Sequence, residues 1–294
     1  MISRFVENRR QDASMGKNRK KKATKTKTRR PGRPAIRIGL LLFSAALIFW
    51  LALPAIKADS VVYYGFEVVR RLPHDPQAYT QGLLYRDDSF FESTGGYGTS
   101  SLRRVDPDSG RVLERTELAP QYFGEGLAWF KGILIQLTWR ERTAFVYDGE
   151  SFSRLREVGY DTEGWGLTHD GERLIMSDGS QRLYFRDPTD FRVLKVLHVT
   201  QQGREIRGLN ELEYIDHEIW ANIYQTNHIV RISPDTGKVL GLIDLTGILA
   251  KEDRNGNEDV LNGIAYHGEQ GKIFVTGKRY SFIYEIRLTV KKKS

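Results

Sequence analysis

Glu125 lies between two glycines in the segment 123–127 and is followed at once by residues typical of a β-strand. Four comparable positions occur elsewhere, each in front of a Gly or Glu and an aliphatic residue, and they hold Gln81, Trp165, Asn210 and Asn262. One carboxylate, three amides and an indole suit a pocket for a small polar ligand. A carboxylate in such a pocket can take up and release a proton. We therefore expect the five side chains to face one another, with Glu125 as the general acid and base.

A second group of residues follows three of these positions at a similar distance along the chain. It consists of Trp139, Tyr224 and Lys278, which come after the positions of Glu125, Asn210 and Asn262, respectively. These residues stand at the ends of the next expected strands. They add an amine and aromatic walls, so the pocket suits a ligand that carries an amide or an amine.

Each of these side chains also has a structural interpretation. Glu125 could cap backbone N–H groups, and the amides could do the same for neighbouring strands. Trp139 and Trp165 could fill the core, as buried aromatic residues usually do. Lys278 could be a solvated charge at the rim. The register that the positions share favours the functional interpretation.

The spacing of the five positions identifies the elements that hold them. Each position begins a first strand that two further strands follow, and four of the five units continue through a turn into a short fourth strand. Four strands in roughly 40 to 50 residues are typical of a propeller blade, whose first strand lines the central channel. We predict an all-β fold, a five-bladed β-propeller over residues 61–290, in preference to a β-sandwich or two small β domains.

The fifth unit ends too early to contain a fourth strand, because its third strand ends near Leu288 and the chain stops at Ser294. A single strand is expected at residues 62–72, before the first unit. We predict that this N-terminal strand supplies the outer strand of the last blade. It would close the ring and cover an otherwise bare edge.

Composition excludes several kinds of site. The 294 residues include no cysteine, which excludes disulfides and thiolate chemistry, and the six histidines lack metal-ligand spacing. The glycines around Glu125 lack the third glycine of a dinucleotide-binding loop. We expect no cofactor and no metal.

The net charge of +8 is concentrated at the N-terminus. Residues 1–37 hold 14 Lys and Arg against two acidic residues, a net of +12, so the remainder carries −4. We expect residues 1–37 to be a disordered cytoplasmic tail. Residues 38–56 form an uncharged apolar stretch. About 20 apolar residues cross a bilayer as a helix, so this stretch is predicted to be a transmembrane helix.

Positive charge before residues 38–56 places the part of the chain that follows outside the cytoplasm. Residues 38–56 are therefore predicted to be an uncleaved signal anchor, with the catalytic domain extracytoplasmic, in the periplasm if the source is bacterial. The alternative is secretion after cleavage of a signal peptide. The basic run could bind nucleic acid or anionic lipid, but we expect it only to orient the anchor. Membrane association through residues 38–56, no nucleic acid and a monomeric state are predicted.

Several segments together resemble the glutaminyl-peptide cyclotransferases of plant and bacterial type. They are residues 79–83, 91–95, 123–127, 164–167, 209–214, 220–223, 259–265 and 274–278. The resemblance covers nearly all of residues 62–290 and does not extend to residues 1–60. It implies a five-bladed propeller that converts N-terminal glutamine of peptides or proteins into pyroglutamate and releases ammonia, without a catalytic metal.

The resemblance also implies the residues of the pocket. The family's pocket positions correspond here to Gln81, Glu125, Trp139, Trp165, Asn210 and Lys278. Tyr79 and Tyr224 stand where the plant pattern has Phe and Trp, so an aromatic wall is kept at both positions. We predict that Glu125 and Lys278 are catalytic. Substrate binding is predicted for Gln81, Trp139, Trp165, Asn210, Tyr224, Asn262 and Tyr79.

In the expected reaction the α-amine of the substrate attacks its own γ-carboxamide, so holding the folded conformer supplies much of the rate. Glu125 would move the proton from the amine to the leaving ammonia, a role that a pKa raised by burial favours. Lys278, Gln81 and Asn210 are candidate donors to the oxyanion. The alternatives are a non-catalytic peptide- or sugar-binding propeller and a metal-dependent lactonase or phosphoesterase.

Overall fold

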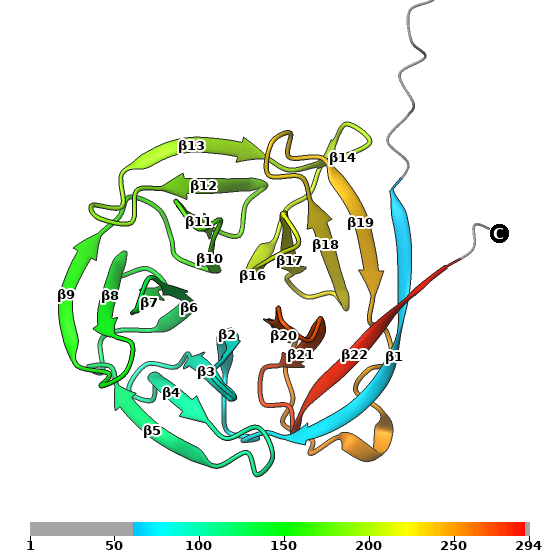
Figure 1. Cartoon of the computed structure of the whole chain (residues 1–294), viewed down its shortest axis with the longest axis horizontal. Coiled ribbons are helices and arrows are strands. Elements are labelled where there is room, and N and C mark those ends of the chain that lie inside the picture. Colours follow the sequence, from blue (N-terminus) through cyan, green and yellow to red (C-terminus); the bar gives the residue numbers. More distant parts are fainter. Residues whose placement is uncertain (1–60, 292–294) are drawn as a thin grey trace, which may run out of the picture. The chain divides into compact units, whose positions relative to one another are not determined.

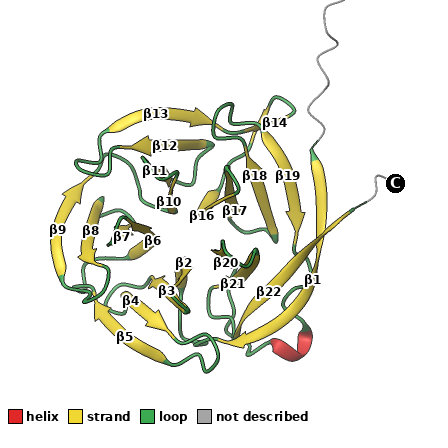
Figure 2. Cartoon of the chain, in the orientation of Figure 1, coloured by secondary structure: helices red, strands yellow, loops and turns green. Residues whose placement is uncertain are grey.

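The computed structural model describes residues 61–291, and within this range the regular elements are almost all β-strands, arranged around a central axis (Figure 1). Its helical content is one short 3-10 turn, η1 (Lys251–Asp253), as Figure 2 shows. The all-β prediction is confirmed. The sheets are arranged radially, in the manner of a propeller.

Three of the sheets have four antiparallel strands each, and the strands follow one another from the axis outward. The first contains β2 (Thr80–Arg86), β3 (Ser89–Thr94), β4 (Ser101–Val105) and β5 (Val112–Glu117). The second contains β6 (Gly124–Phe130), β7 (Ile133–Thr138), β8 (Thr143–Asp148) and β9 (Arg154–Gly159). The third contains β10 (Leu167–His169), β11 (Leu174–Ser177), β12 (Arg182–Arg186) and β13 (Val193–His198).

The remaining long strands form one eight-stranded sheet in two halves. One half contains β16 (Leu209–Ile215), β17 (Glu218–Ile223), β18 (His228–Ile232) and β19 (Val239–Asp244). The other contains β20 (Leu261–His267), β21 (Lys272–Gly277), β22 (Phe282–Val290) and β1 (Val62–Pro73). A separate hairpin is formed by β14 (Thr200–Gln201) and β15 (Arg204–Glu205).

Strand β1 joins the two ends of the ring. It pairs antiparallel with β22, from Tyr64 opposite Val290 to Pro73 opposite Phe282. The predicted contribution of residues 62–72 to the last unit is therefore confirmed. The first residues of β1 also pair in parallel with β19, with Val62 opposite Gly241. This second pairing fuses the two halves into one sheet and ties the N-terminal strand to two units.

Tight turns set the register of the inner hairpins. Asp87 and Asp88 connect β2 to β3 with φ values of 46° and 53°, and Asp216 and His217 connect β16 to β17 with φ values of 48° and 64°. Positive φ at both central residues is the geometry of a two-residue type I′ turn, whose twist matches that of the strands. The first two strands of these units are therefore held in fixed register.

Glycines allow the inner strands to approach one another at the axis. A Cβ on Gly82 or Gly126 would lie 2.5 Å from the backbone nitrogen of Leu127 or Leu167, respectively. A Cβ on Gly166 would lie 2.0 Å from the carbonyl oxygen of Asn210. Any side chain at these positions would force the strands apart. These three glycines therefore permit the close approach of neighbouring inner strands.

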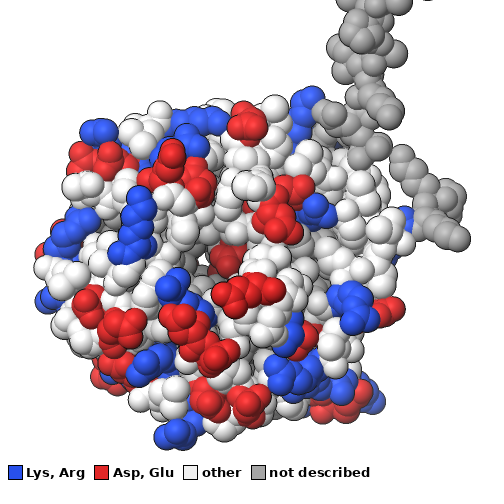
Figure 3. Space-filling model, viewed as in Figure 1, with Lys and Arg blue, Asp and Glu red and all other residues white. Residues whose placement is uncertain are grey.

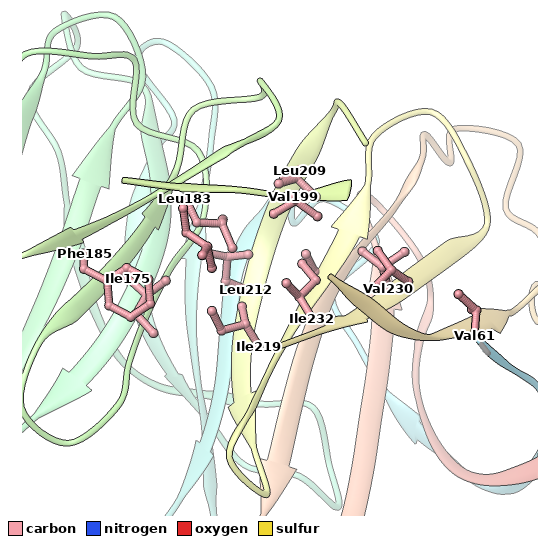
Figure 4. Packing of buried hydrophobic residues seen from close by; sticks show 13 residues of the cluster. Val61, Ile175, Leu183, Phe185, Val199, Leu209, Leu212, Ile219, Val230 and Ile232 are labelled. Carbon is pink, nitrogen blue, oxygen red and sulfur yellow. The ribbon is translucent and has the colours of Figure 1, made fainter. Parts of the chain in front are cut away.

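The hydrophobic core lies between neighbouring sheets. Figure 4 shows one such cluster, in which Ile175, Leu183 and Phe185 of the third sheet meet Leu212 and Ile219 of the next unit. Burying such aliphatic and aromatic side chains stabilises the packing of one sheet on the next by about 1.5–3 kcal/mol each. The sheets therefore form a rigid frame for the side chains at the axis.

The predicted tail (residues 1–37) and anchor (residues 38–56) lie outside the described residues. Within residues 61–291, no helix has the length and apolar character needed to span a bilayer.

Candidate active site

A cavity of about 190 Å³ lies where several inner strands begin. It is lined by Tyr79, Gln81, Phe123, Glu125, Trp139, Trp165, Asn210, Tyr224 and Lys278. Antiparallel pairing within a unit places the start of its first strand beside the end of its second strand. Gly124 pairs with Thr138, which places Glu125 near Trp139. Leu209 pairs with Ile223 in the same way, which places Asn210 near Tyr224.

Irregular pairing at the start of the inner strands presents the polar side chains to the cavity. The register shifts between Thr80 and Gly82, and Gln81 lies inside this irregularity. Glu125 and Asn210 lie inside the corresponding shifts of β6 and β16. A β-bulge re-aims a side chain that would otherwise follow the strict alternation of the strand.

Glu125 is a buried carboxylic acid, 5% exposed, and its Oε1 accepts a hydrogen bond of 2.9 Å from Nε2 of Gln81. Burial raises the pKa of Glu125 well above its usual range, and the nearby charges of Glu163 and Glu141 raise it further. The positive charge of Lys278 acts in the opposite direction. A raised pKa suits a group that must both accept and return a proton near neutral pH.

The contacts of Glu125 differ from those of Glu211, another buried glutamate of an inner strand. Glu211 caps backbone, since its two oxygens accept the N–H groups of Leu83 at 3.2 Å and Ile264 at 2.8 Å. Within residues 61–291, Glu125 accepts its hydrogen bond from a side chain only. Capping of backbone N–H groups is therefore the role of Glu211, whereas the carboxylate of Glu125 borders the cavity.

Lys278 places an ammonium group in the cavity wall although the residue is only 3% exposed. Its Nζ lies 4.8 Å from the ring centroid of Tyr79 and 5.4 Å from that of Tyr224, within the range of cation–π attraction. Burial lowers the pKa of Lys278, while the carboxylates of Glu125 and Asp259 oppose the shift. In the part of the chain that the structure describes, the ammonium has no hydrogen-bond acceptor. Its N–H donors are therefore available to a ligand.

Aromatic rings form the remaining walls. Trp165 and Tyr224 meet edge to face with centroids 5.4 Å apart, and Phe123 and Trp139 meet at 5.6 Å. The hydroxyl of Tyr79 donates to Asp259 at 2.7 Å, which fixes the ring beside Lys278. Among the described residues, Oδ1 of Asn210 is buried without a hydrogen-bond partner. An unpaired acceptor in a cavity wall is costly unless a ligand donates to it.

Figure 3 shows one face of the ring, with a hollow at its centre and an acidic side chain inside the hollow. Within residues 61–291, no cluster of three or more His, Asp or Glu side chains could hold a metal ion.

Comparison with known proteins agrees with this geometry. The family model for glutamine cyclotransferases matches residues 41–288. The chain belongs to the glutamine cyclotransferase family. A protein of Arabidopsis thaliana named glutaminyl-peptide cyclotransferase is 45% identical over 226 residues, which are 76% of this chain and 71% of that protein. The crystal structure of Myxococcus xanthus glutaminyl cyclase matches with a TM-score of 0.75 and 35% identity, covering 79% of this chain and 100% of that one.

Eight of the nine predicted site residues line the cavity of this glutamine cyclotransferase; Asn262 is the exception. Asn262 is 0% exposed, and its Nδ2 donates to the carbonyl oxygen of Thr80 at 3.1 Å and to Oε1 of Gln81 at 3.3 Å. The next residue, Gly263, has a φ of +127°, which gives the start of β20 a different backbone path. Asn262 therefore contacts Gln81, which lines the cavity, and its own role in substrate binding stays a prediction.

Two residues that contribute to the site were not predicted from the sequence. Phe123 lines the cavity, and its place directly before the Gly-Glu-Gly segment was a signal that could have identified it. Glu163 contacts two of the wall residues through its carboxylate. Its place shortly before Trp165 carried no comparable signal.

Proposed function

We propose that this protein converts the N-terminal glutamine of peptides and proteins into pyroglutamate and releases ammonia. The observation that carries the proposal is the burial of Glu125 in a cavity that also contains the ammonium of Lys278. A cavity of about 190 Å³ is smaller than the roughly 300–1,000 Å³ of drug-sized sites and suits one glutamine residue. Membership of the glutamine cyclotransferase family supports the same activity.

In the proposed mechanism the α-amine attacks the γ-carbonyl carbon, which forms the ring C–N bond. Glu125 takes the proton that the amine nitrogen loses and returns it to the amide nitrogen, so that the C–N bond breaks with release of ammonia. Gln81 already donates to Glu125 and holds it in place. Oδ1 of Asn210 can accept an N–H of the substrate.

Lys278 is the favoured donor to the oxyanion that forms when the carbonyl is attacked. Nε2 of Gln81 is already engaged with Glu125, whereas the ammonium of Lys278 has no acceptor within residues 61–291. A positive group beside the developing negative charge stabilises the transition state more than the ground state. The reaction as proposed needs no metal.

We also propose that the fold is a five-bladed propeller, in which the eight-stranded sheet counts as two blades joined by β1 and β19. The monomeric state, the signal anchor at residues 38–56 and an extracytoplasmic catalytic domain remain proposals that rest on sequence patterns. Carbonate extraction of membranes tests the anchor, because the anchored protein stays in the pellet. Recovery of the mature protein in the supernatant would favour the cleaved form.

The activity is tested by incubating the full-length protein with a peptide that begins with glutamine. We expect release of one ammonia per peptide and loss of the free N-terminus. The same peptide with an N-terminal asparagine is the control, because its shorter side chain cannot close the five-membered lactam. Binding of the glutamine peptide without release of ammonia would support the non-catalytic alternative.

A further inference from the structure

Glu163 lies in the segment between β9 and β10, and its carboxylate contacts both tryptophans of the cavity. Its Oε2 accepts a hydrogen bond of 2.8 Å from Nε1 of Trp139 and one of 3.1 Å from Nε1 of Trp165. Trp139 follows β7 of the second sheet, and Trp165 precedes β10 of the third. One oxygen atom therefore links cavity walls that two different sheets supply.

The carboxylate of Glu163 is itself held in place. The next residue, Gly164, donates its N–H to the carbonyl oxygen of Trp139 at 3.0 Å. A Cβ on Gly164 would lie 2.5 Å from the carbonyl oxygen of Thr138, so the backbone packs closely here. On the outer side, Nε of Arg140 lies 3.5 Å from Oε1 of Glu163, and the Arg140 guanidinium lies 3.8 Å from the Trp139 ring centroid.

An indole has a single hydrogen-bond donor, so the contact with Glu163 fixes the orientation of each ring. Hydrogen bonds to a charged acceptor are roughly twice as strong as neutral ones. Because both donors point to one oxygen, the two rings cannot rotate independently of each other.

We propose that Glu163 is a positioning residue, which sets the separation and orientation of Trp139 and Trp165 around the glutamine side chain of the substrate. This inference rests on the proposed function. Glu163 does not line the cavity and acts through the two indoles. Correct placement of these walls favours the folded conformer in which the α-amine reaches the γ-carbonyl carbon, and misplacement of about 1 Å can cost roughly a hundredfold in rate.

The test compares Glu163→Ala and Glu163→Gln in the full-length protein. Glu205→Ala is the control, since Glu205 is also a partly exposed carboxylate with an arginine partner and does not line the cavity. For Glu163→Ala we expect KM to rise by about tenfold. A change of this size corresponds to the free energy of about one charge-assisted hydrogen bond. A smaller fall in kcat is expected. Glu163→Gln keeps an acceptor oxygen and should recover most of the loss in KM.

The indole N–H resonances of tryptophan-labelled protein provide a readout that is independent of activity. We expect two of them to move in Glu163→Ala and to stay near their wild-type positions in Glu163→Gln and Glu205→Ala. A Glu163→Ala variant with wild-type KM and unmoved resonances would overturn the proposal. A Glu163→Gln variant with native resonances and the KM of the alanine variant would also overturn the proposal. The rise in KM would then come from loss of the charge of Glu163 and not from displacement of the two rings.

The proposed function and this inference fail in different ways. A wild-type protein that releases no ammonia would refute the function, while the resonances would still report the contact. An active wild type whose KM does not depend on residue 163 would refute only the positioning role.

Discussion

His74 and Glu92 form a buried pair, with His74 Nε2 3.0 Å from Glu92 Oε1 and their side chains 1% and 2% exposed. The other ring nitrogen, Nδ1, lies 2.7 Å from the carbonyl oxygen of Tyr280. The carbonyl oxygen of Tyr280 accepts from Nδ1, and the geometry suits an imidazolium ring that also donates from Nε2 to the carboxylate of Glu92. Glu92 also accepts the hydroxyl of Thr80 at 2.7 Å.

This ion pair connects two parts of the active site. Thr80 precedes Gln81, and Tyr280 lies shortly after Lys278. Burial disfavours the charged ring of His74, but the carboxylate of Glu92 and the hydrogen bonds outweigh it and raise the pKa of His74 above 6.5. Burial likewise opposes the charge of Glu92, and His74 nevertheless lowers the pKa of this carboxyl below 4.5.

The first prediction concerns stability and pH. The contribution of His74 is complete below pH 6.5 and is lost as the pH rises through its raised pKa in the folded state. The contribution of Glu92 is complete above pH 4.5 and is lost as the pH falls through its lowered pKa. Urea unfolding from pH 5 to pH 9 should show the free energy of unfolding falling at alkaline pH. His74→Gln should lower the free energy of unfolding by about 3 kcal/mol at pH 6 and make it less dependent on pH. A variant with the pH profile of the wild type would contradict this prediction.

The second prediction concerns the proton carrier. Glu125→Gln keeps the shape of the side chain but cannot accept a proton. We expect kcat to fall by roughly 10²–10⁴-fold. Thermal unfolding should change little, because the amide fills the same space and burial disfavours a charge at this position. The measurement is ammonia release together with the melting temperature, and a variant with a near-normal rate would remove Glu125 from the mechanism.

The third prediction concerns Lys278→Met, which removes the positive charge but keeps a long side chain. We expect kcat to fall by about 10²–10³-fold through loss of the oxyanion donor. Lys278 lowers the pKa of Glu125, so its removal should raise that pKa and move the acidic limb of the kcat/KM profile to higher pH. The substrate amine titrates equally with both enzymes, so the difference between the two profiles reports the enzyme. An unshifted limb would show that the two groups do not interact.

The fourth prediction concerns Glu211, which caps two backbone N–H groups of neighbouring inner strands. Glu211→Ala leaves both donors buried without an acceptor, and each such loss costs about 1–3 kcal/mol. On this basis we expect the free energy of unfolding in urea to fall by about 3 kcal/mol. Glu172→Ala, at an exposed position, is the control and should stay within about 0.5 kcal/mol of the wild type. Equal stability of the two variants would show that the cap is dispensable.

Most of the cavity was predictable because the repeat carries the relevant geometry. Glu125 and Trp139, for example, meet through the pairing of Gly124 with Thr138. The pairing of Leu209 with Ile223 brings Asn210 and Tyr224 together in the same way, so the equal spacing of these two pairs along the chain was informative. Asn262 lies outside the cavity lining, and the backbone at the next residue, Gly263, follows another path, with φ at +127°.

Periodicity was enough to establish the all-β class, the closing role of residues 62–72 and the register that gathers Gln81, Glu125 and Asn210. It is a local property repeated along the chain, and it can therefore be recognised without coordinates. The links from Glu163 to Trp139 and Trp165 and the pairing of His74 with Glu92 became visible only in three dimensions. These contacts join side chains across strands or sheets, and their formation depends on how rigid units pack rather than on any spacing in the chain.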